Sequence, residues 1–256
     1  MKLVKLYEEI IRENEAQACV AKFGKELFDP QLQIGGEPST IEPNTDVENN
    51  YLELIGNFTN IDYGVRINPN FVKAMDNLKS CMSSYPEVLQ PEGMAYRGSR
   101  LTLRQLLTQY EDIADDLETG GEFDITYAPK SPIQSWTSEK DTAEGFASPS
   151  PLLMKFVKQY RQVKDNPEQL AALVEEIYPQ MDDAKCPITI SLMTSKDDFL
   201  FKAKYFTFLS QFEGEDELLR VNNKPTRVTA EIIEPLLDAV YGILTSIKRY
   251  EQLKNR

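Results

Sequence analysis

Two glutamates in the segment QFEGEDELL, Glu215 and Glu217, are separated by a single residue and precede an apolar pair. In an extended chain, residues two apart point to the same side, so both carboxylates would face one way. Like charges held side by side are unfavourable unless they face water or serve a chemical purpose. The segment is therefore either a solvated acidic turn or part of an active site.

Two other short segments contain residue types that could bind an anionic ligand or orient a carboxylate. Arg97 precedes Gly98 at the end of a predicted strand, where an arginine could bind phosphate through two parallel hydrogen bonds and the glycine would allow close approach. Ser135 and Thr137 alternate in another predicted strand around Trp136. Taken singly, each segment also has a structural explanation: a surface arginine, or a strand whose tryptophan packs in the core.

The absence of histidine limits the chemistry that this chain can perform. With no histidine in 256 residues, His-based acid–base catalysis and Ser-His-Asp or Cys-His arrangements are excluded. The three cysteines, Cys19, Cys81 and Cys186, are far apart and form no CxxC pair, so we expect reduced thiols and no metal site. Any catalysis must use carboxylates, arginine, lysine, hydroxyls or a thiol.

Charge and hydropathy exclude several partners. The formal net charge of −13 argues against direct nucleic-acid binding and against an anionic lipid surface. No stretch reaches about 18 uninterrupted apolar residues, so we expect no membrane partner. The N-terminal segment MKLVKLYEEIIRENEAQ is amphipathic and charged, unlike a secretory signal, and a cytoplasmic location is expected.

Hydrophobic periodicity predicts an α+β protein, because helices and strands do not alternate regularly as they do in a doubly wound sheet. The principal predicted helices cover 3–17, 69–83, 101–117, 138–147, 150–163, 167–180 and 235–253. The predicted strands cover 94–98, 133–137, 188–194, 199–208, 217–221 and 226–233. We expect three regions: a helical accessory region at 1–90, a core at 91–234 with a helical insertion around 148–186, and a C-terminal helix at 235–256.

The order of the three motifs resembles the Arg–Ser–Glu class of mono-ADP-ribosyltransferases over roughly residues 93–233. Members of that class have an arginine on the first strand, a Ser-Thr-Ser-like strand and a Glu-x-Glu motif after an acceptor-recognition turn. Tyr96-Arg97-Gly98, Ser135-Trp136-Thr137 and Glu215-Asp216-Glu217 follow this order. The resemblance implies an ADP-ribosyltransferase fold of two packed, roughly perpendicular β-sheets with flanking helices.

The resemblance also implies that NAD is a substrate and that no metal is needed. Arg97 would hold a phosphate or ribose of NAD, and Ser135 would hydrogen-bond Glu217 and fix its rotamer. Glu217 would bind the nicotinamide ribose and stabilise the oxocarbenium-like cation left when nicotinamide departs. Contacts with NAD are implied for Tyr96, Arg97, Gly98, Ser135, Thr137 and Phe146, the last as a ring near the nicotinamide.

Glu215 would select the acceptor, since family members with glutamate at this position usually modify arginine. A guanidinium has a pKa of about 13 and is a poor nucleophile while charged, so a nearby carboxylate could attract it and accept its proton. Phe212 would lie in the acceptor-recognition turn. The implied partners are proteins with an exposed arginine.

The chain is also similar, more narrowly, to the Mod and Alt ADP-ribosyltransferases of T-even phages. That similarity implies action in a host cytoplasm on proteins such as RNA polymerase or translation proteins. The chain departs from the family pattern after Phe146, where residues 147–151 contain no arginine that could contact a phosphate. Two alternatives remain open: an NAD-consuming enzyme with water or a nucleic-acid group as acceptor, and an inert binding module.

Overall fold

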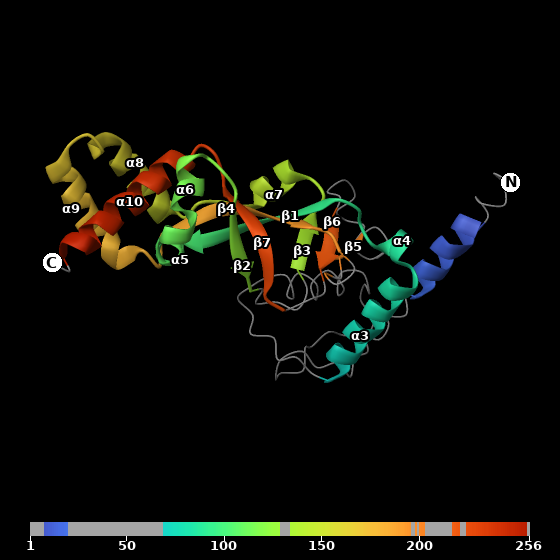
Figure 1. The fold of residues 1–256 in the computed structure, drawn as a ribbon. Coiled ribbons are helices and arrows are strands. Elements are labelled where there is room, and N and C mark those ends of the chain that lie inside the picture. The colour runs from blue at the N-terminus through green and yellow to red at the C-terminus, as the bar shows by residue number, and fades with distance from the viewer. Residues whose placement is uncertain are drawn as a thin grey trace, which may run out of the picture. The chain divides into compact units, whose positions relative to one another are not determined.

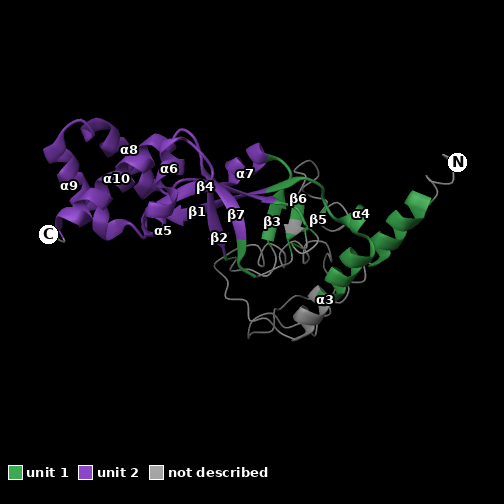
Figure 2. Cartoon of the chain, in the orientation of Figure 1, with its two compact units in different colours: residues 1–95, 128–139, 193–226 green, residues 96–127, 140–192, 227–256 purple. Residues whose placement is uncertain are grey.

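Helices and strands are mixed in an α+β arrangement in the computed structural model of this chain (Figure 1). The structure describes residues 8–19, 69–128, 134–195, 198, 200–202, 217–220 and 224–254. These divide into two compact units that interleave along the chain (Figure 2). Unit 1 comprises 1–95, 128–139 and 193–226, and unit 2 comprises 96–127, 140–192 and 227–256. The three consecutive regions expected from the sequence stay a prediction.

Unit 1 contains three strands in the order β3-β6-β5. They are β3 (Gln134–Thr137), β6 (Glu217–Arg220) and β5 (Leu200–Lys202), and both pairings are antiparallel. Its described helices cover 8–19, α3 (Pro69–Ser84) and α4 (Pro86–Leu89). Leu200 and Leu218 are buried on the face of β5 and β6 that also carries Arg220, so these two strands share a buried face.

Unit 2 contains strands in the order β2-β7-β4-β1. These strands are β2 (Phe123–Tyr127), β7 (Thr226–Ile232), β4 (Lys185–Met193) and β1 (Met94–Thr102). The first two residues of β1 and the first residue of β7 belong to unit 1. β4 and β7 are antiparallel, and Ile188 pairs with Ile232. Every second residue of β7 is buried, which gives this strand one apolar face and one partly exposed face.

Unit 2 has six described α-helices, and four of them pack against the C-terminal one. They are α5 (Leu103–Thr108), α6 (Tyr110–Glu118), α7 (Lys140–Phe146), α8 (Pro151–Val163), α9 (Pro167–Ile177) and α10 (Leu237–Lys254). α10 packs against α5, α6, α8 and α9 and buries Val240, Ile243, Leu244 and Ile247. None of the helices in the described ranges combines the length and the apolar character needed to cross a membrane.

The prediction of one helix over 101–117 was wrong. β1 continues to Thr102, whose side chain accepts a hydrogen bond from the Gln105 backbone in a capping box, so α5 begins only at Leu103. A second helix, α6, then begins after Gln109. Neither β2 nor the short helix α4 was predicted.

Two helix boundaries predicted from the sequence are confirmed within a residue: the helix start at 167 and the helix end at 117. The Asn166 side chain accepts a hydrogen bond from the Gln169 backbone at the start of α9, and Pro167 occupies the first helical position. Gly120 follows α6 with a positive φ of 73°, a conformation that suits glycine after the end of a helix. Local chemistry determines these boundaries, which explains why the sequence revealed them.

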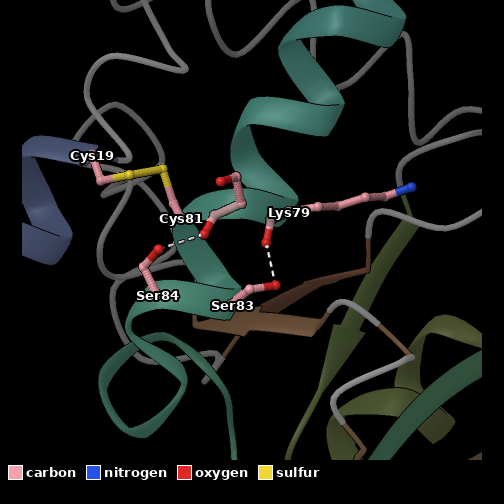
Figure 3. The surroundings of a disulfide bond; sticks show 6 residues. Cys19, Lys79, Cys81, Ser83 and Ser84 are labelled. Atoms are coloured by element: carbon pink, nitrogen blue, oxygen red, sulfur yellow. Dashed lines mark hydrogen bonds between the residues drawn. A yellow bond between two sulfur atoms is a disulfide. The ribbon is translucent and has the colours of Figure 1, made fainter.

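The expectation of three reduced thiols was also wrong, because the structure joins Cys19 to Cys81 in a disulfide (Figure 3). Their Cα atoms lie 5.8 Å apart although 62 residues separate them in the sequence. Cys19 is the last described residue of the helix over 8–19, and Cys81 is buried in the last turns of α3. Sequence spacing could not predict the pairing, because folding alone brings these two helices together.

The disulfide fastens a helix that otherwise makes few described contacts. In the helix over 8–19 only Ala16 is fully buried, and Ile10 and Ile11 are exposed. An ion pair of 2.8 Å joins Arg12 to Glu87, but both side chains are exposed and such pairs contribute little. The covalent bond is therefore the strongest described attachment of this helix to the rest of unit 1.

Thiol titration tests the disulfide. We expect one reactive thiol in the unreduced, denatured protein and three after reduction. The remaining thiol, Cys186, is buried in β4, and burial raises its pKa to about 12, so it should not react with Ellman's reagent at pH 8 in the folded protein. Cys186→Ala should leave no reactive thiol without reduction. Three thiols in the unreduced wild type would contradict the pairing.

Candidate functional site

The strand with the serine and threonine pairs directly with the strand that begins at Glu217. The antiparallel register of β3 and β6 places Thr137 opposite Glu217 and Ser135 opposite Leu219. Because residues alternate in a strand, positions 135, 137 and 217 lie on one face of the two strands. Thr137, rather than Ser135, is the direct neighbour of Glu217. The predicted hydrogen bond between Ser135 and Glu217 stays a prediction.

The face of β3 that carries Ser135 and Thr137 is partly shielded from solvent. Thr137 is buried and Ser135 is half-buried. The Thr137 Oγ1 accepts a hydrogen bond of 3.1 Å from the Glu139 backbone, which fixes the path of the chain as it leaves β3 toward α7. A hydroxyl-bearing strand with this turn can present polar groups to a ligand from a defined backbone.

The opposite face of β3 and β6 contains a fully buried arginine that sequence reasoning missed. Arg220 is 0% exposed, and its guanidinium donates to Gln134 Oε1 at 3.2 Å and to Thr226 Oγ1 at 2.5 Å. The Asp198 carboxylate lies 3.8 Å from the guanidinium, and the Trp136 ring centroid lies 5.9 Å from it. A charged residue after two leucines in a predicted strand was the available signal.

Arg220 links β6 to β3 through hydrogen bonds on the face opposite the candidate site. Burying a guanidinium is unfavourable unless charge and hydrogen bonds compensate it, and here a carboxylate, an amide, a hydroxyl and an indole surround it. Asp198 is itself held by a 2.5 Å hydrogen bond from the Ser195 hydroxyl. The network therefore stabilises the pairing that places position 217 opposite Thr137.

In unit 2, β1 and α7 approach each other unusually closely at Gly98. A Cβ atom added to Gly98 would lie 2.2 Å from the Ala143 carbonyl oxygen, 2.8 Å from the Ala147 nitrogen and 3.1 Å from the Phe146 carbonyl carbon. All three are backbone atoms, so no side-chain rotation could relieve the clash. The glycine after Arg97 is thus required for α7 to pack against β1.

The other residues predicted near NAD in this unit are accessible to different degrees. Phe146 ends α7 and is 65% exposed, so its ring is available to a ligand. Arg97 and Tyr96 are half-buried on β1. The Gly98 contact fixes the backbone of Phe146 relative to the strand that carries Arg97.

The predicted site residues fall into two described groups. Tyr96, Arg97, Gly98 and Phe146 belong to unit 2, whereas Ser135, Thr137 and Glu217 belong to unit 1. Glu215 and Phe212 lie outside the described residues. Among the residues that are described, no group of three or more Cys, Asp or Glu side chains could hold a metal ion.

No protein-family model, curated protein or solved structure matches this chain. The resemblance to mono-ADP-ribosyltransferases consequently rests on the three motifs and on the strands that carry them. The finer fold prediction, two packed perpendicular sheets, stays a prediction as well.

Replacement of Gly98 by alanine tests the contact between β1 and α7. The added methyl group would overlap three backbone atoms, and overpacking of this kind lowers the free energy of unfolding by about 1–3 kcal/mol. Gly145→Ala is the matched control, because a Cβ there meets nothing within 4 Å and alanine favours the helix. Urea unfolding measures both variants. Equal stabilities for the two variants would contradict the close approach.

Replacement of Arg220 tests the buried network in unit 1. Arg220→Ala leaves Asp198 without its ion pair and opens a cavity, so the free energy of unfolding should fall by about 3–5 kcal/mol. Arg227→Ala is the control, since Arg227 is also paired with an aspartate, Asp124, but its side chain is 80% exposed. We expect less than about 1 kcal/mol for the control. A similar loss for both arginines in denaturant titrations would refute the structural role of Arg220.

Proposed function

We propose that this protein transfers ADP-ribose from NAD to arginine side chains of other proteins and releases nicotinamide. The observation that carries the proposal is the antiparallel pairing of the Ser-x-Thr strand with the strand that begins at Glu217. The resemblance requires these two motifs to be neighbours, and they are distant in the sequence. A chance similarity of motifs would not require that pairing.

The second support comes from the arginine-glycine motif. Gly98 allows α7 to pack on β1, so the backbone of Phe146 lies beside the strand that carries Arg97. The proposed roles of these two side chains, a phosphate or ribose contact and a ring beside the nicotinamide, both require such proximity. Arginine suits the first role because its planar, permanently charged group can donate two parallel hydrogen bonds.

The proposed reaction uses carboxylates in place of the missing histidine. The bond between nicotinamide and the ribose C1′ breaks, nicotinamide leaves with the electron pair, and Glu217 stabilises the ribose cation. A nitrogen of the acceptor guanidinium then forms the new bond to C1′. Glu215 accepts the proton that this nitrogen loses, so the nucleophile is neutralised as it reacts.

Paired measurements of nicotinamide release and of ADP-ribose transfer to a polyarginine acceptor test the proposal. Glu217→Gln should reduce both rates by about 10²–10³-fold, the effect typical of removing one electrostatic stabiliser. Glu215→Gln should abolish transfer to arginine and retain slow nicotinamide release. Asp216→Asn is the control and should retain both activities.

The same assay separates the alternatives. Free ADP-ribose without any adduct on the acceptor would support an NAD glycohydrolase and refute the transferase. Adducts on added RNA but not on polyarginine would indicate a nucleic-acid acceptor. If the wild type consumes no NAD, the chain is an inert binding module and the proposed function is wrong.

A further inference from the structure

A row of polar side chains lies on one face of β4 and β7 in unit 2. The strand register places Thr189 opposite Glu231 and Ser191 opposite Thr229. The intervening residues are apolar and buried, among them Ile190. Alternation therefore separates an apolar face from a face that carries three hydroxyls and a carboxylate.

The first residue of α7 lies over this polar face. The Lys140 ammonium is 2.5 Å from the Glu231 carboxylate and 3.9 Å from that of Glu144. The hydrogen bond to Glu231 raises the pKa of Lys140, and the charges of Glu231, Glu144 and Glu122 act in the same direction, while partial burial opposes them. Lys140 is consequently charged at neutral pH and fixes the start of α7 to β7.

A small pocket lies between the lysine and the strands. Its volume is about 10 Å³, and its lining includes Tyr96, Lys140, Thr189, Ser191, Thr229 and Glu231. Nearly every described side chain around it can donate or accept a hydrogen bond. Such a volume is close to that of a single water molecule.

One hydroxyl in this pocket lacks a partner. Thr189 is 3% exposed, and its Oγ1 is buried without a hydrogen bond to any described residue. Buried side-chain hydroxyls are almost always hydrogen-bonded, because an unsatisfied one loses its solvation without compensation. The hydroxyl therefore indicates a ligand in the pocket that can donate or accept.

We propose that the pocket binds one water molecule, which hydrogen-bonds Thr189 Oγ1 and connects β4 to the polar groups around the Lys140–Glu231 ion pair. A cation would meet the charge of Lys140, and an anion would meet the carboxylates of Glu231 and Glu122. A neutral molecule that both donates and accepts suits this mixed lining. The inference of this hydration site is independent of the proposed transferase activity.

The bound water would have a structural consequence for α7. It extends the network from the buried hydroxyl of β4 through β7 to the first residue of the helix, at the end away from the Gly98 contact. α7 is then fixed to the strands at both ends: by polar groups at Lys140 and by close backbone packing at Gly98. A polar network with every member hydrogen-bonded favours one position of the helix.

The proposal is tested by whether Thr189→Val lowers or raises the stability of the protein. If water occupies the pocket, Thr189→Val removes one of its partners, and the equilibrium constant for unfolding should rise roughly fivefold or more in urea titrations. If the pocket is dry, valine replaces an unsatisfied hydroxyl by a methyl group and stabilises the protein. An unchanged or increased stability of Thr189→Val overturns the proposal.

A control substitution and a crystal structure of the wild type support the test, and the crystal structure does not depend on whether Thr189→Val folds. Thr126→Val, on the exposed face of β2, corrects for the intrinsic effect of valine in a strand. A high-resolution crystal structure of the wild type should show a solvent density peak within hydrogen-bond distance of Thr189 Oγ1. No peak there, in a map that resolves other buried waters, overturns the proposal even if Thr189→Val does not fold.

Discussion

The ladder between β3 and β6 is the interaction on which the rest of the candidate site depends. It joins segments far apart in the chain; Gln134 and Arg220, whose side chains hydrogen-bond across it, are 86 residues apart. Closing such a long loop is entropically unfavourable, so the ladder must be held by more than a few backbone hydrogen bonds. The buried network around Arg220 provides that stabilisation on the face opposite Ser135 and Thr137. Rigid support behind a polar face is what precise positioning of a ligand requires.

Unit 2 positions its part of the candidate site by a different physical means. There the close approach of β1 and α7 depends on the missing Cβ of Gly98, and the start of the helix is attached to β7 by the Lys140–Glu231 ion pair. One contact is steric and the other electrostatic, and together they determine where α7 ends. Phe146 is exposed at that end, so a well-positioned backbone presents an aromatic side chain to solvent.

Polar groups contribute differently in the exposed and buried parts of the molecule. The pairs Arg12–Glu87 and Arg227–Asp124 are short but exposed, and water competes with them. Arg220 and Thr189 are fully enclosed, where a lost partner is not replaced by solvent. For this reason the buried polar residues, rather than the numerous surface charges, determine the arrangement of the strands near the candidate sites.

The sequence by itself determined the α+β class, most helix and strand positions, the start of a helix at Pro167 and the order of the three motifs, because these depend on local periodicity and composition. It did not determine that the 101–117 segment is divided at Thr102 and Gln109, or that β2 forms. Only the tertiary structure decided that Cys19 bonds Cys81, that Arg220 is buried, that Gly98 touches α7 and that Thr137 pairs with Glu217 in the strand register. Each of these facts depends on residues distant in sequence whose proximity is created by folding, and residue spacing along the chain contains no record of that proximity.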